Sequence, residues 1–179
     1  MSAALLFNKL LTEFILAEGV SGTYSKAELL IREGEREDHL YYIVSGSVRV
    51  FLLSEFEEMT IRFGYAGSVI NSLSSFYSGK PSEFFIEAMK KTEVRMITRD
   101  QCNALIGASE ENLRGYVALL ELLVTQQIER EIDLLTVSPG ERLRRVLERS
   151  PNLFQEVSLK HIASYLRMTP ETLSRVRNS

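Results

Sequence analysis

The sequence predicts an α+β fold, and three observations lead to that prediction. Short β-rich runs punctuated by glycine occupy residues 24–97, a pattern typical of an antiparallel barrel or sandwich. Residues 110–136 contain no glycine after Gly115 and no proline, which predicts one long helix. Residues 158–179 form two short helical patterns that meet at a three-residue joint, the arrangement of a helix-turn-helix.

Composition indicates a globular chain. With 179 residues, 45% of them hydrophobic, it can bury a core as one large or two small domains. No apolar run approaches the ~20 residues of a membrane span, and Lys9 and Glu13 make the N-terminal run amphipathic rather than a signal sequence, so we expect a cytoplasmic protein. The single cysteine, Cys102, gives no internal disulfide and no metal-ligand spacing, and we expect it to be a core residue.

Charge is distributed unevenly along the chain. From residue 140 onward there are eight Lys or Arg and four Glu, a net charge of +4, which leaves −7 for the rest of a chain whose total is −3. An acidic body with a basic tail is expected where only the tail meets phosphate, although a basic solvated surface would give the same pattern.

The elements of the first half follow from hydrophobic periodicity. Residues 3–18 predict a helix whose apolar face is Leu6, Leu10, Phe14 and Ala17. Four strands are expected at 29–31, 41–44, 48–53 and 59–64. The third, VRVFLL, is apolar on much of both faces and is therefore expected to be central.

The C-terminal residues carry capping signals for both short helices. Ser158 can cap a helix over 159–167, whose apolar face is Ile162, Ala163 and Leu166. Thr169 can cap the second, with Pro170 at its first position, where the missing N–H costs nothing.

The second helix turns polar side chains outward. Glu171 and Arg175 stand four residues apart, and a Glu can accept from cytosine N4 while an Arg can donate to guanine O6 and N7. The alternative is an exposed intrahelical ion pair. The candidate DNA-binding residues are Ser158, Lys160, Thr169, Pro170, Glu171, Thr172, Ser174, Arg175 and Arg177.

The long helix has more apolar surface than one contact can cover. A heptad-like seam predicts a two-fold dimer, and two recognition helices would then favour a palindromic operator; the alternative is a monomeric helix buried between two domains. A break at 138–140 precedes a helix over 140–149 with Leu143, Val146 and Leu147 inward and the arginines outward. The seam residues are Leu113, Val117, Leu120, Val124 and Gln127.

The run LLIREGEREDHLYYIVSGSVRVF, residues 29–51, resembles the first half of the cyclic-nucleotide-binding-type β-roll. With the helix-turn-helix, the whole chain is similar to Crp/Fnr-family transcription regulators. The resemblance implies an antiparallel β-roll (double-stranded β-helix, jelly-roll-like) flanked by helices, in a bacterial, homodimeric, non-enzymatic DNA-binding regulator. It also implies RNA polymerase and an unknown small-molecule effector as further partners, with no membrane partner.

This resemblance divides the chain into a sensor domain (1–109), a dimerisation helix (110–137) and a DNA-binding domain (138–179). The last is short, because a β-wing often present in the family is missing from a chain ending at Ser179. Family members usually carry Gly in the turn, where φ is positive, and here Arg167 takes that place. A further Arg commonly precedes the Glu of the recognition helix, and here that position is Pro170.

The cassette that holds cyclic nucleotide in the family corresponds to residues 67–89. Gly67 is kept, Ser68 replaces the Glu, and the phosphate-binding Arg falls on Pro81 or Ser82, so cyclic nucleotide is a disfavoured cofactor. Phe76, Tyr77, Phe84 and Phe85 suit an apolar or cationic ligand, or simply fill the roll. The candidate effector pocket is Gly67, Ser68, Val69, Lys80, Ser82, Glu83, Phe84 and Phe85.

Other chemistries find no support in the sequence. An iron–sulfur cluster needs several cysteines, and His39 and His161 are expected in solvated or capping roles rather than as haem ligands. No nucleophile–base pair, P-loop or metal-ligand spacing appears, so no catalytic residue and no metal ligand is predicted. The rival hypothesis is a ligand-binding or protein-interaction sensor with a vestigial DNA-binding unit; steep salt dependence of DNA binding separates the two.

Overall fold

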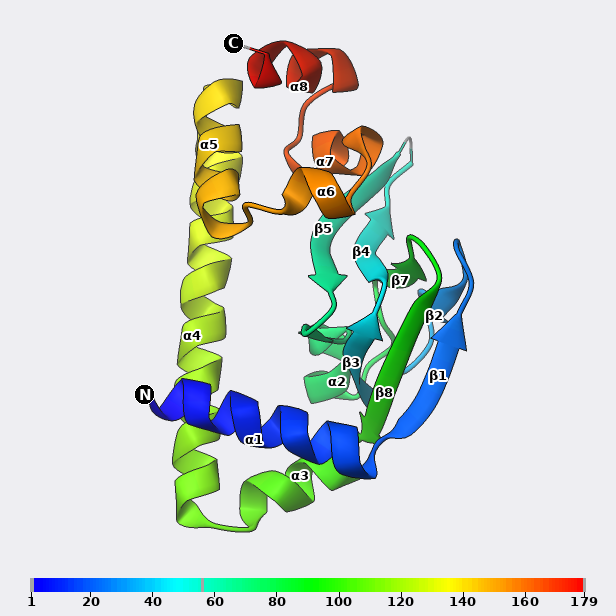
Figure 1. Ribbon diagram of the computed structural model, residues 1–179, viewed down its shortest axis with the longest axis vertical. Coiled ribbons are helices and arrows are strands. Elements are labelled where there is room, and N and C mark those ends of the chain that lie inside the picture. Colours follow the sequence, from blue (N-terminus) through cyan, green and yellow to red (C-terminus); the bar gives the residue numbers. More distant parts are fainter. Residues whose placement is uncertain (1, 56, 179) are drawn as a thin grey trace.

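The computed structural model describes residues 2–55 and 57–178, and its strands form two antiparallel sheets packed as a roll (Figure 1). One sheet has the order β1-β8-β3-β6 and the other β2-β7-β4-β5, which confirms the predicted α+β class. The strands are β1 (Val20–Tyr24), β2 (Leu29–Ile31), β3 (His39–Ser45), β4 (Ser47–Leu53), β5 (Glu58–Tyr65), β6 (Val69–Ile70), β7 (Phe85–Ala88) and β8 (Thr92–Thr98).

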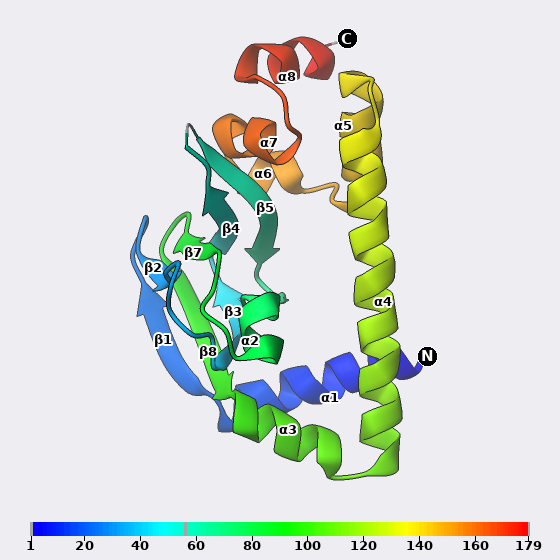
Figure 2. The same cartoon turned by 180° about the vertical axis from the view of Figure 1, so that it is seen from behind.

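The helices lie at the two ends of the roll and along the side away from β1 and β2, and the long one stands beside the roll from end to end (Figure 2). It is crossed near its start by the N-terminal helix, and its far end carries the C-terminal helices. The helices are α1 (Ala3–Glu18), α2 (Leu73–Ser78), α3 (Arg99–Gly107), α4 (Glu110–Leu135), α5 (Pro139–Arg149), α6 (Leu153–Glu156), α7 (Leu159–Tyr165) and α8 (Pro170–Arg177).

Strand β4 is central, as its sequence predicts. It pairs with β5 on one side and β7 on the other, and residues 47–51 are all buried. The connection from β3 to β4, which passes from one sheet to the other, turns at Gly46, whose φ of 90° is in the left-handed region; a Cβ there would lie 2.5 Å from the Lys91 carbonyl oxygen. Only glycine fits this turn.

Helix α1 has its predicted bounds, but the predicted buried face is wrong. Leu6 and Leu10 are exposed, and the buried stripe is Ala4, Phe7, Leu11 and Ile15. This helix carries two apolar stripes, and periodicity alone does not say which one meets the core.

Helix α1 crosses α4 at Gly115. A Cβ at this glycine would lie 2.7 Å from Cβ of Phe7, so the absent side chain is what permits the close approach of the two helices. The glycine inside an otherwise strong helical pattern therefore has a packing role.

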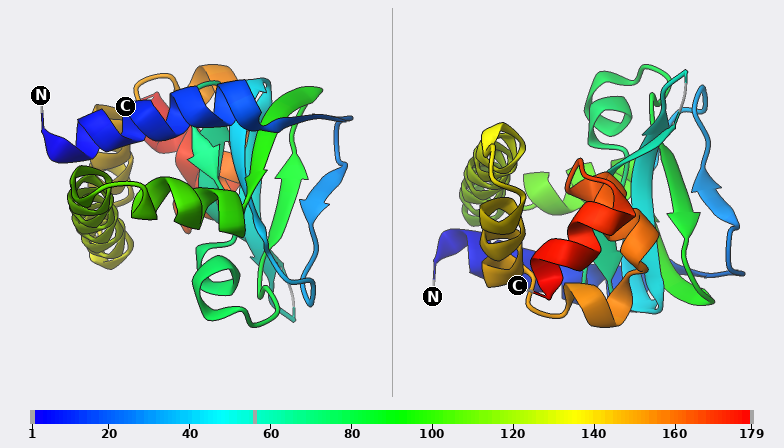
Figure 3. Two further views of the ribbon diagram at one scale, coloured as in Figure 1. Left: turned by 90° about the horizontal axis from the view of Figure 1, so that it is seen from below. Right: turned by 90° about the horizontal axis from the view of Figure 1, so that it is seen from above.

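The C-terminal helices follow the predicted order, with bounds that differ by one or two residues. Seen from above, α7 and α8 lie between α5 and the strands of the roll (Figure 3). Their apolar cluster, which includes Leu143, Ile162 and Leu173, is extended by Phe63 and Tyr65 of β5. The C-terminal unit therefore shares its core with the roll.

Among the helices of residues 2–55 and 57–178, none is both long enough and apolar enough to cross a bilayer.

Candidate functional site

The α7–turn–α8 unit forms where its capping residues predict it. The Thr169 hydroxyl accepts from the Thr172 backbone N–H at 3.2 Å, Pro170 opens α8, and Leu173 is fully buried. Ser158 occupies the N-cap of α7 with extended backbone, and no hydrogen bond from its side chain to the helix is found in the described chain. Ala163 is buried where α7 and α8 meet, as its small size predicts.

The turn between the two helices has the expected left-handed residue. Arg167 has φ of 53°, and the Met168 N–H donates to the Ala163 carbonyl at 3.1 Å. A non-glycine residue in this conformation costs about 1 kcal/mol. Arg142 of α5 offsets part of that cost, because its guanidinium donates to the carbonyls of Leu166 (2.5 Å) and Arg167 (3.1 Å).

The outward face of this unit is polar. Most of the nine candidate DNA-binding residues are exposed, and Thr172 is half-buried beneath the Thr169 cap. The Arg177 guanidinium lies over the Phe154 ring, 4.9 Å from its centre. Glu171 and Arg175 are both exposed on α8. The backbone N–H of Glu171 and, to a lesser extent, the Thr169 side chain lower the pKa of the Glu171 carboxyl.

Three arginines expected to face solvent on α5 make contacts with α4 and the turn, and of these Arg149 remains exposed. Arg142 also donates to the Thr136 carbonyl at 2.7 Å. Arg145 contacts Asp133 at 2.9 Å, and Arg149 pairs with the other oxygen of the same carboxylate, which is fully buried. Part of the positive charge of the C-terminal tail is therefore paired with groups of the protein itself.

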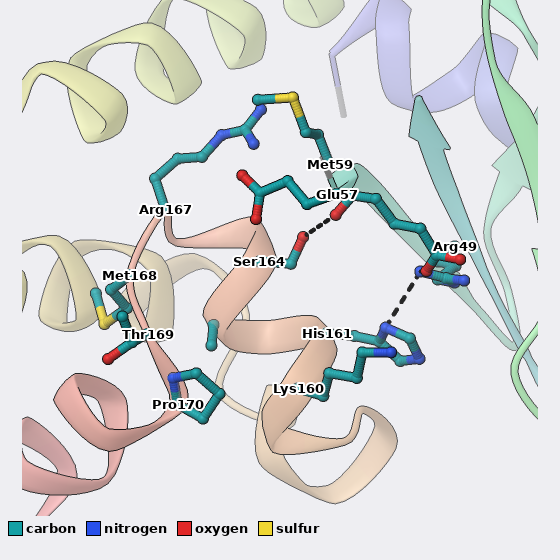
Figure 4. Close-up of a pocket in the computed structure, with 12 residues that line it drawn as sticks. Arg49, Glu57, Met59, Lys160, His161, Ser164, Arg167, Met168, Thr169 and Pro170 are labelled. Atoms are coloured by element: carbon teal, nitrogen blue, oxygen red, sulfur yellow. Dashed lines mark hydrogen bonds and ion pairs between the residues drawn. The ribbon is translucent and has the colours of Figure 1, made fainter. Parts of the chain in front are cut away.

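The C-terminal unit is docked on the β4–β5 hairpin. The Ser164 hydroxyl accepts from the Thr60 N–H at 3.0 Å and donates to the Glu58 carbonyl at 2.8 Å, and the Tyr165 and Phe63 rings are 5.1 Å apart. Beside this contact is a cavity of about 800 Å³ (Figure 4). Its lining includes Glu57 and Glu58 on the roll side and Lys160, Thr169 and Pro170 on the other.

A buried guanidinium connects the two sides. Arg49, with a side chain 4% exposed, contacts Glu58 at 2.7 Å, Glu87 at 3.1 Å and His161 Nδ1 at 3.3 Å. Because a guanidinium only donates, Nδ1 must be the acceptor in this contact.

His161 therefore has a structural role that the sequence did not reveal. Burial lowers its pKa, and the adjacent Arg49 charge lowers it further. The hydrogen bond from Arg49 lowers the pKa of Glu58. The expectation of a solvated or capping role for His161 is wrong, because the ring faces the interior of the interface. His39 begins β3, half-buried, and its N–H donates to Glu37 at 3.0 Å.

The predicted effector residues are divided between two places. Gly67 (φ 90°), Ser68 and Val69 form the turn from β5 into β6, where the Ser68 hydroxyl accepts from the Tyr65 N–H at 3.0 Å. The other five lie in the loop before β7 or at its start. There Lys80 and Glu83 are exposed, Ser82 is buried, and Phe84 and Phe85 are half-buried.

Inside the roll, the loop before β7 meets a buried acid. The hydroxyls of Ser72 and Ser82 are 2.8 Å apart, and the fully buried Glu37 carboxylate accepts from the Ser72 N–H at 3.4 Å and the Tyr41 hydroxyl at 3.4 Å. Desolvation raises the pKa of Glu37 to about 7. A phosphate placed here would meet a carboxyl group instead of a guanidinium.

Helix α4 leaves most of its predicted seam uncovered. Leu113, Val117 and Val124 are 50%, 46% and 59% exposed, and Ile128 continues the same stripe at 51%. Such a row of large apolar side chains on one helix face is typical of an association surface.

A model of the cyclic nucleotide-binding domain matches residues 22–109. The cAMP-activated global transcriptional regulator CRP of Escherichia coli O157:H7 is 32% identical over 91 residues, 50% of this chain and 43% of that protein. The nitrogen fixation regulation protein FixK of Rhizobium meliloti is 26% identical over 165 residues, 86% of this chain and 72% of the relative. The chain thus spans less than half the length of the CRP relatives it matches.

Solved structures extend the likeness over both parts of the chain. FixK2 from Bradyrhizobium japonicum superposes with a TM-score of 0.77 at 25% identity, covering 89% of this chain and 83% of that one. A CooA mutant from Carboxydothermus hydrogenoformans shares the fold, with a TM-score of 0.73 at 21% identity and coverage of 92% and 77%. The structure is therefore a cyclic-nucleotide-binding-type β-roll joined to a helix-turn-helix. In sequence and in fold the chain is therefore similar to Crp/Fnr-type regulators.

Proposed function

We propose that this chain is a sequence-specific DNA-binding transcription regulator that acts as a homodimer. The observation that carries the proposal is α8, which is held by the Thr169 cap and the buried Leu173 and presents Glu171 and Arg175 to solvent. Glu and Arg in this arrangement suit base edges in the major groove, and the surrounding hydroxyls suit phosphates. The likeness to FixK over 72% of that regulator supports the same function.

The uncovered stripe on α4 supports the homodimer. A two-fold axis along this helix would place two copies of α8 in successive major grooves, about 34 Å apart, and would favour a palindromic operator. The corresponding division of labour assigns residues 1–109 to sensing, 110–137 to dimerisation and 138–179 to DNA binding. In this scheme the protein is cytoplasmic and non-enzymatic, and RNA polymerase is its further partner.

The test is selection of bound sequences from a random duplex pool by the purified chain at two salt concentrations. We expect enrichment of a palindrome, weaker at high salt because phosphate contacts release counterions. Arg175→Ala should lose that enrichment. Arg144→Ala is the matched control, since Arg144 is also exposed, lies on α5 and pairs with Glu141 and Glu148. A folded dimer that enriches nothing at either salt contradicts the proposal and favours the sensor with a vestigial DNA-binding unit.

A further inference from the structure

A second cavity, of about 520 Å³, lies between the roll, α4 and the C-terminal helices, and we call it the central cavity. Strands β5 and β6 form one wall, α4 another, and α5 to α7 the third; α4 faces β5 across this region in Figures 1 and 2. Its apolar lining includes Phe63, Leu123 and Leu153. The volume is that of a small-molecule site.

The charge of the lining is one-sided. Arg62, Arg130 and Arg149 line the central cavity, and its lining includes no Asp or Glu within the described chain. Arg149 is accounted for by its ion pair with Asp133. The other two guanidinium groups have no carboxylate partner among residues 2–55 and 57–178.

The side chain of Arg62, on β5, has neither a hydrogen bond nor an ion pair to any described residue, and burial holds its pKa below the usual value. Arg130, on α4, donates through Nη2 to the Tyr165 carbonyl and stacks over the Tyr165 ring at 3.7 Å. Its Nη1 is buried and has no partner in the described part of the chain. Both arginines therefore line the same cavity, and burial lowers the pKa of each.

Two partly buried guanidinium groups without a carboxylate partner reduce the stability of the fold, and an anion bound beside both would offset that cost. The planar guanidinium donates two parallel hydrogen bonds to a carboxylate, and Gln126 and Gln127 line the same cavity with further polar groups. We propose that the central cavity binds a small organic carboxylate, with its anionic group between Arg62 and Arg130 and its apolar body against Phe63 and Leu123.

This site rests on the proposed function and gives the chemical class of the effector. Its walls belong to the sensor roll, the dimer helix and α7 of the DNA-binding unit, so one bound anion would contact all three. Of the residues nominated from the sequence as the effector pocket, Ser68 and Val69 line this cavity.

Benzoate is the probe, and benzamide, which has nearly the same shape without the charge, is its control. Thermal unfolding of the full chain should show a saturable increase in Tm with benzoate and none with benzamide, because a ligand of the native state stabilises it. Arg62→Met and Arg130→Met should each weaken benzoate binding by about tenfold or more, the loss expected for a charged hydrogen bond. Arg114→Met, a substitution on an exposed part of α4, should leave binding unchanged.

Without benzoate, Arg62→Met should unfold at or above the wild-type temperature, since an unpaired guanidinium is removed. Equal protection by benzoate and benzamide, no protection by either, or full benzoate binding by Arg62→Met overturns the site. Sequence selection on DNA is measured separately without benzoate. Benzoate binding without DNA enrichment then rejects the proposed function and retains the site. Enrichment without benzoate binding rejects the site and retains the proposed function.

Discussion

Replacing Arg49 by Met tests whether the buried ion cluster holds the C-terminal unit to the roll. Methionine keeps the apolar stem and removes the charge, which leaves Glu87 (side chain 18% exposed) and Glu58 (39% exposed) without their partner. Breaking a buried ion pair from one side costs about 3–5 kcal/mol, and the exposure of Glu58 to water reduces its share. We therefore expect a loss of about 3 kcal/mol.

For a chain of this size that loss corresponds to a decrease in Tm of about 6–12 °C. Urea unfolding followed by circular dichroism gives the free energy from the midpoint and slope, at one protein concentration because dimerisation adds to apparent stability. Arg114→Met is the matched control: Arg114 and its partner Glu110 are each 76% exposed, and the expected change is below about 0.5 kcal/mol. An Arg49→Met protein within that same margin of wild type would refute the reasoning.

The cluster also predicts an acid sensitivity. The pKa values of Glu58 and His161 are both lowered in the folded protein, so each group contributes stability above its ordinary pKa that is lost as pH falls through the folded value. The window for His161 begins below 6.5, its ordinary value, and that for Glu58 below 4.5. In Arg49→Met the lower window should shrink, because the hydrogen bond from Arg49 is the main cause of the Glu58 shift.

Three further substitutions test other parts of the molecule. The pKa of Glu37 is raised from 4.5 to about 7, so its protonated carboxyl contributes to the free energy of unfolding at low pH, and this contribution is lost as pH rises through 7. Glu37→Gln should therefore gain about 3 kcal/mol relative to wild type between about pH 4 and about pH 8, and urea midpoints that move in parallel would contradict this. Asp133→Ala removes the buried carboxylate that Arg145 and Arg149 share, although both still contact Glu129. The substitution should lower the unfolding free energy by about 2 kcal/mol, and a stability equal to wild type would show that Glu129 and solvent compensate the two arginines. Val124→Glu should convert the dimer to a monomer in sedimentation, whereas Leu122→Glu, on the opposite side of α4, should leave it dimeric.

The sequence predicts well those local features that depend on residues within about one helical turn of each other. The Thr169 cap and Pro170 at the start of α8 follow from residues at most four positions apart, whereas the positive φ at Arg167 follows from the family resemblance; the structure has each of them. The α+β class and the central strand β4 follow from periodicity in the same way. The choice between the two apolar stripes of α1 does not, because it depends on where α4 lies.

The interface and the central cavity depend on contacts that no local pattern encodes. Arg49 meets His161 across 112 positions, and Arg62 and Arg130 come from a strand and a helix that meet only in the folded chain. The sequence did contain a signal: Arg49 interrupts VRVFLL and Arg62 interrupts MTIRFG, and a charge inside an otherwise apolar strand must either find a partner or serve a ligand.

Arg49 and Arg62 are both charged residues in apolar strands, but their surroundings differ. Arg49 has two carboxylates and a histidine around it and stabilises the docked arrangement, whereas Arg62 has no acceptor in residues 2–55 and 57–178 and faces a cavity. The same kind of anomaly thus identifies a structural cluster in one strand and a candidate ligand site in its neighbour. Opposite stability effects of Arg49→Met and Arg62→Met, one strongly destabilising and the other neutral or stabilising, would establish this distinction experimentally.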